Sequence, residues 1–215
     1  FKLKALLTIF TLIYSGFLMS QSDSVMITEL KPFNDGLYFT NTDHRLNKAI
    51  SKENIVTNIN KDQIDFYYKV TSTPKIEYSV GGATYTIEPS HIWGFVQNGT
   101  LFVNYKEVFY RVPVFGAISY FAGVVEVTGY YTGVYDPMFG AGSGRTVKTK
   151  ELNEFIVSYF DGNVVPFDMN YLDMLLSTDE TVYKEFKSLN KRKRRKQVTR
   201  FIRMYNEKHP VHYLK

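Results

Sequence analysis

The chain has 215 residues, which is enough for one medium-sized domain with an appended segment. Hydrophobic residues make up 44% and charged residues 22%, a balance that excludes intrinsic disorder for most of the chain. The absence of cysteine excludes disulfides, thiolate metal sites, thiol nucleophiles and a lipid-modified leader cysteine. Seventeen Tyr and seventeen Phe favour β structure, because aromatic side chains fit a pleated, half-buried surface.

The first twenty residues have the order of a secretory signal peptide. Lys2 and Lys4 precede an uncharged and mostly apolar run, residues 5–19, which small and polar residues follow. The run is shorter than the roughly 20 apolar residues of a membrane-spanning helix. We therefore expect a leader over residues 1–20, cleaved before Gln21, with an uncleaved anchor or a buried N-terminal helix as alternatives. The mature protein would be exported to the periplasm or outer membrane, or secreted.

Residues 21–165 have the pattern of an antiparallel β-rich domain. Strands are expected near residues 37–40, 63–70, 108–112 and 114–121. Two hairpins are predicted more sharply, because two-residue turns need residues that accept a positive φ. Gly81-Gly82 separates the alternating segments 76–80 and 83–87, and Asn98-Gly99 separates segments 92–97 and 100–105.

Residues 112–134 contain a single charged residue, Glu126. Pro113 and four glycines argue against a membrane helix, so we predict two buried strands joined near Ala122-Gly123. A polar, Gly-rich loop is expected over residues 136–150. Residues 151–161 fit either a strand or a helix.

The pattern becomes helical after Pro166. A helix is expected over residues 169–176. Ser177 and Glu180 have the spacing of a capping box, which predicts the start of a second helix at this point. Asn190 would cap a last helix, in which Val198, Phe201, Ile202 and Tyr205 recur at i, i+3, i+4 and i+7. The predicted fold class is α+β. An antiparallel β-meander of six to eight strands, open or partly closed into a barrel, precedes two or three helices over residues 166–215 that pack on it.

No pattern of catalytic or metal-binding residues is found. The four histidines lie in no motif with a nucleophile, and Gly142-Ser143-Gly144 lacks the spacing of a nucleophile elbow. Residues 140–145 lack the spacing of a phosphate-binding loop. Asp62 and Asp65 could form a carboxylate pair, but acids in such a polar segment are usually solvated. We predict a non-enzymatic protein without cofactor or metal.

Positive charge is concentrated near the C-terminus. Residues 181–215 hold twelve Lys or Arg against two acids, a net charge of +10, whereas residues 1–180 carry 14 basic and 19 acidic residues, a net charge of −5. Such separation indicates an anionic partner or a solvated helix face. The candidate binding residues are Lys191, Arg192, Lys193, Arg194, Arg195, Lys196, Arg200 and Arg203.

Two functions follow from these patterns. The leading one is an envelope protein that contacts anionic lipid, lipopolysaccharide or an acidic protein through this segment; the acidic remainder of the same chain is also eligible. Nucleic acid is disfavoured, because export makes it scarce and no aromatic stacking residues interleave the charges. The alternative is a β domain that binds carbohydrate or a small ligand in a cleft lined by Tyr and Trp93, if those aromatic residues do not simply fill the core.

Three segments resemble uncharacterised exported proteins of Bacteroidota-type bacteria. They are Asp35-Gly36-Leu37-Tyr38, the stretch from Ile92 to Phe102, and the stretch from Tyr183 to Pro210. The resemblance implies export and cleavage before Gln21. It implies no activity, and it carries no functional residues.

Overall fold

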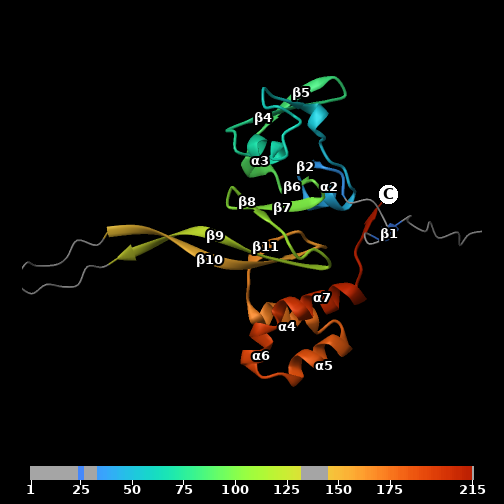
Figure 1. The fold of residues 1–215 in the computed structure, drawn as a ribbon, viewed down its shortest axis with the longest axis vertical. Helices are drawn as coiled ribbons and strands as arrows, with labels where there is room; N and C mark the ends of the chain where they lie inside the picture. The colour runs from blue at the N-terminus through green and yellow to red at the C-terminus, as the bar shows by residue number, and fades with distance from the viewer. Residues whose placement is uncertain (1–23, 27–32, 132–144, 215) are drawn as a thin grey trace, which may run out of the picture.

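The computed structural model describes residues 24–26, 33–131 and 145–214, and it has the α+β class that the sequence predicts (Figure 1). The expected leader, its cleavage site and residues 136–144 of the expected loop lie outside the described residues. The strands are antiparallel, as predicted, and they are distributed over several sheets instead of one continuous meander. They divide into separate antiparallel sheets of order β2-β6-β7-β8, β3-β4-β5 and β11-β10-β9, with a small β1-β12 pair. None of these sheets closes into a barrel.

The central sheet contains the Asn-Gly hairpin that the sequence predicts. Its strands are β2 (Gly36–Tyr38), β6 (Gly94–Gln97), β7 (Thr100–Tyr105) and β8 (Val108–Arg111). Asn98 and Gly99 have φ values of 51° and 68°, as the tight turn requires. The Asp35 carboxylate accepts hydrogen bonds from both turn amides, at 2.8 Å and 3.0 Å, and so ties β2 to the turn.

A second sheet, β3-β4-β5, lies at the end of the molecule opposite the C-terminal helices (Figure 1). Its strands are β3 (Ile55–Val56), β4 (Ile76–Val80) and β5 (Ala83–Ile87), and the predicted Gly81-Gly82 hairpin is confirmed. The 3-10 turns η2 (Lys52–Asn54) and η3 (Pro89–His91) and the helix α3 (Phe66–Thr71) interrupt this part of the chain, whereas the helix α2 (Asn41–Arg45) lies beside β2 of the central sheet (Figure 1). The strand expected over residues 63–70 is wrong, because this segment ends in α3.

The third sheet is built on a long two-stranded ribbon. β9 (Ile118–Tyr131) and β10 (Arg145–Ser158) pair over 14 residues each, and β11 (Val164–Pro166) adds to the inner end of β10. The predicted break near Ala122-Gly123 is therefore wrong. Gly123 instead admits the Tyr110 ring, which a Cβ at this position would overlap. The loop expected over residues 136–150 is also wrong for residues 145–150, which belong to β10.

Four helices cover one side of the inner ribbon (Figure 1). They are α4 (Met169–Leu176), α5 (Glu180–Ser188), α6 (Lys191–Lys196) and α7 (Val198–Lys208). The predicted Ser177 cap is wrong: Ser177 is the C-cap of α4, and α5 is capped by Asp179, which accepts the hydrogen bond from the Val182 amide. Gln197 separates α6 from α7, so the expected last helix is two helices.

The core joins the helices to the ribbon. Val198, Phe201 and Ile202 are buried as predicted, in a cluster with Ile118 and Ile156 of the ribbon. The opposite side of the ribbon packs on the central sheet through stacked rings of Tyr110, Phe121 and Phe155. A β12 strand (His212–Leu214) then returns to β1 (Ser24–Met26).

Candidate functional site

The basic segment forms its own short helix, α6. The Asn190 side chain accepts a hydrogen bond from the Lys193 amide at 3.0 Å and starts the helix. At Gln197 the backbone leaves helical geometry, which ends α6 after six residues. No residue of α6 is buried, so apolar packing by its own side chains does not hold it in place.

Two arginines attach α6 to the rest of the molecule. Arg195 is hydrogen bonded to the Glu154 carboxylate of β10 and lies 4.7 Å from the centre of the Phe167 ring. Arg194 lies 5.4 Å from the centre of the Phe186 ring and 3.8 Å from the Asp173 carboxylate. These contacts combine charge pairing with cation–π attraction, and both strengthen as water is removed.

The Arg195 contact extends to a tyrosine of the ribbon. Burial and the neighbouring Glu154 carboxylate raise the pKa of Tyr120 to about 12. The hydrogen bond that the Arg195 guanidinium donates to the Glu154 carboxylate likewise raises the pKa of Arg195, so the guanidinium keeps its charge. Together with Glu154, these two groups form one polar contact between α6 and the sheet.

The other cations of α6 point to solvent. Lys191, Arg192, Lys193 and Lys196 are exposed, and none makes an ion pair with a carboxylate of the described residues. Together with Asn190 they line one shallow hollow of the surface. We call these four residues the basic patch.

The predicted site of eight cations is thus divided by the fold. The basic patch brings four of them together. Arg194, Arg195 and Arg200 make intramolecular ion pairs, the last with Glu185, and Arg203 is exposed on α7. The acidic part of the chain, residues 1–180, therefore supplies the partners of two arginines, Arg194 and Arg195, which was one of the options that the sequence left open.

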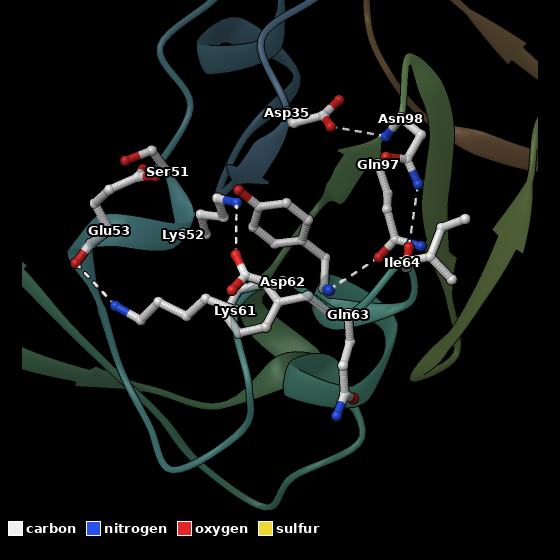
Figure 2. Close-up of a pocket in the computed structure, with 12 residues that line it drawn as sticks. Asp35, Ser51, Lys52, Glu53, Lys61, Asp62, Gln63, Ile64, Gln97 and Asn98 are labelled. Carbon is white, nitrogen blue, oxygen red and sulfur yellow. Dashed lines mark hydrogen bonds and ion pairs between the residues drawn. The ribbon is translucent and has the colours of Figure 1, made fainter.

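A separate cavity of about 470 Å³ lies between the end of β6 and residues 51–67 (Figure 2). Charged groups of both signs surround it, and several of them form ion pairs or hydrogen bonds within the lining. Lys52 lies 3.9 Å from Asp62, and the Lys61 ammonium donates to the Glu53 carbonyl at 3.1 Å. Burial raises the pKa of Tyr67, on the floor of the cavity, above its usual range.

The carboxylate pair weighed from sequence is not formed. Asp62 pairs with Lys52 at the cavity, whereas Asp65 pairs with Lys69 one helical turn ahead, at 3.1 Å. Trp93 does not line an open groove either: its indole N–H donates to the Gly162 carbonyl at 2.8 Å, and its ring lies against His44.

His44 is a feature that sequence reasoning did not single out. Its side chain is fully buried, and neither ring nitrogen has a hydrogen-bond partner among the residues that the structure describes. Phe33, Tyr38, Trp93 and Phe115 surround it, with ring centres between 3.9 Å and 5.7 Å away. Burial lowers its pKa to about 3, so the imidazole is neutral. No sequence signal marks it, because Trp93 and Phe115, which complete the cage, are remote in sequence and become neighbours of His44 only in the fold.

Among the described residues, no group of three or more His, Asp or Glu side chains is placed to hold a metal ion. No described helix is long and apolar enough to cross a membrane. No family model, curated protein or solved structure matches the chain. Function must therefore be argued from the geometry of the chain itself.

Proposed function

We propose that this chain is a non-enzymatic binding protein of the bacterial cell envelope, and that the basic patch contacts an anionic lipid surface. The observation that carries the proposal is the contrast within one short helix. Arg194 and Arg195 are paired with carboxylates, whereas the four cations of the basic patch have none and surround a common hollow. Like charges held so close repel each other, and a polyanion removes that repulsion.

The chemistry of the patch favours lipid phosphate over an acidic protein. Stable protein interfaces have an apolar centre, but α6 offers only charged side chains and a capping asparagine. Attraction of a polybasic segment to an anionic membrane needs no apolar centre and amounts to about 1 kcal/mol for each Lys or Arg near the surface. Arg192 adds a planar guanidinium that can bind phosphate with two hydrogen bonds.

Vesicle flotation tests this proposal. The whole chain is mixed with vesicles of phosphatidylcholine alone or with added phosphatidylglycerol, at low and at physiological salt. We expect binding only to the anionic vesicles, and weaker binding at higher salt because exposed charges are screened. The variant K191Q, R192Q, K193Q and K196Q removes the four charges of the basic patch. It should lose about 4 kcal/mol of membrane-binding free energy, which weakens binding on the order of a thousandfold.

A matched control removes the same charge elsewhere. The exposed residues Lys75, Lys106, Lys150 and Arg111 supply three lysines and one arginine for the same change to Gln. Binding by this control should stay close to that of the unchanged chain. Equal loss in both variants, or binding to neutral vesicles, would refute the proposal. Binding to duplex DNA but not to anionic vesicles would refute the lipid proposal and identify nucleic acid as the partner.

The cavity beside Tyr67 supports a second candidate function, the binding of a small zwitterionic ligand. Its volume lies in the ordinary range of ligand sites, and its rim carries both charge signs. An NMR titration with free amino acids should shift the signals of Gln97 and Asn98 in the unchanged chain. The variant Asp62→Lys should not respond, and the absence of any shift would exclude this function.

A further inference from the structure

The outer part of the β9-β10 ribbon extends away from the rest of the molecule (Figure 1). β9 is the edge strand of its sheet, because the order is β11-β10-β9. Beyond Phe121, the backbone of β9 pairs with that of β10 alone among the described strands, and the only other strand that contacts it by a hydrogen bond there is β8, through the Tyr110 hydroxyl. An isolated two-stranded ribbon is only marginally stable in water, so additional pairing would stabilise it.

Two hydrogen bonds show which backbone groups of the ribbon point outward. The Tyr110 hydroxyl donates to the Val124 carbonyl at 2.9 Å, on the free side of β9. The Phe167 amide donates to the Glu154 carbonyl at 2.7 Å, on the other side of β10. Because outward groups recur at every second residue, Glu126 and Thr128 also direct their backbone N–H and C=O away from the ribbon.

The two edges of the ribbon are not equally protected. On β10 the corresponding outward positions include Lys148 and Lys150, and lysine on an edge discourages pairing with other strands. β9 has one charged residue, Glu126, in 14 residues, and it has no proline. A long edge of this composition is a surface for strand addition.

We propose that this edge pairs antiparallel with β9 of a second copy of the chain, with the two-fold axis at Val127. In this register each Glu126 lies opposite Thr128 of the other copy, and the outward amides and carbonyls of both residues are satisfied. Centring the axis on Glu126 would instead place two carboxylates opposite each other, which is unfavourable. The product is a continuous four-stranded sheet of order β10-β9-β9-β10. This pairing is independent of the basic patch.

Sedimentation equilibrium of the whole chain tests the proposal. The unchanged protein should dimerise. Thr128→Pro removes an outward N–H without removing a bond to β10, so it should raise the dissociation constant by on the order of tenfold or more. Lys150→Pro makes the same backbone change on the opposite edge and should leave the constant unaltered. A monomer at all concentrations, or equal effects of the two prolines, would overturn the proposal.

Cross-linking then tests the register, since the chain has no cysteine of its own. Val127→Cys places the new thiols opposite each other at a pair where antiparallel strands approach most closely. It should give a disulfide-linked dimer under mild oxidation. Val147→Cys, on the same face of β10, should remain monomeric on a non-reducing gel. Efficient cross-linking of Val147→Cys but not Val127→Cys would contradict this arrangement.

Discussion

The consecutive helices α6 and α7 are held against the same sheet by opposite means. α7 buries Val198, Phe201 and Ile202, and its Asn206 side chain makes hydrogen bonds of 2.9 Å and 2.8 Å to the backbone of Ile118. α6 buries no residue and is anchored by two arginines. The difference shows how a run of six cations can be docked: two serve as anchors, and their neighbours on the remaining sides of the helix are left for solvent or a partner.

The largest effect should come from the apolar side of this comparison. Phe201 is fully buried against Phe186, with ring centres 5.1 Å apart. Phe201→Ala should lower the free energy of unfolding by about 3 to 5 kcal/mol, because it removes buried apolar surface and leaves a cavity. Urea denaturation measures the change. Arg203→Ala, on the exposed side of the same helix, should alter stability by no more than about 0.5 kcal/mol.

Acid extends the comparison to a buried titratable group, because the apolar site of His44 disfavours the protonated, cationic imidazole. The His44 pKa is about 3 in the folded protein and near 6.5 when unfolded. The unfolded chain therefore binds more protons between these values, and stability falls as the pH drops below 6.5. At pH 4.5 the loss should reach about 2 to 3 kcal/mol.

Urea denaturation across this pH range, with and without His44→Leu, checks the prediction. The slope of stability against pH, rather than its level, is the readout. His44→Leu should flatten the slope, whereas removing the exposed His91 as His91→Gln should leave it intact. An unchanged slope in His44→Leu would show that other groups control the acid response.

A smaller effect is expected when the anchor of α6 is weakened. Glu154→Gln keeps the shape of the side chain but removes the charge that pairs with Arg195. Because the pair is partly exposed, the global cost should be about 1 kcal/mol or less. Local opening should respond more strongly, and hydrogen exchange at the amides of residues 194–197 should accelerate while that of α7 does not. Equal acceleration in both helices would mean that they open together.

The smallest effect on stability should come from the basic patch itself. Changing its four residues to Gln relieves repulsion between like charges, so stability should stay constant or rise by up to about 0.5 kcal/mol. Thermal unfolding measures this directly. A loss of more than about 1 kcal/mol would assign these side chains to the fold and remove the basis for a binding role.

Local signals in the sequence determined the features that depend on neighbours along the chain. Asn98-Gly99 and Gly81-Gly82 predicted their hairpins because few other residues accept the required φ values. The spacing of Val198, Phe201 and Ile202 predicted the buried side of α7, because a helix repeats every 3.6 residues. The sequence also located the positive charge, but not which side chains remain free.

Tertiary contacts decided the rest. Residues 66–71 form α3 where an aromatic strand was expected. The Tyr67 amide, in the first turn of this helix, donates a hydrogen bond of 2.9 Å to the side chain of Gln97, which belongs to the distant strand β6. β9 continues without a break at Gly123, because the Tyr110 ring occupies the space that a side chain would take at this position. Arg194 and Arg195 turn inward because Asp173 and Glu154, remote in sequence, are brought beside them. Each depends on groups that become neighbours only when the chain folds, and this is why local patterns could not reveal them.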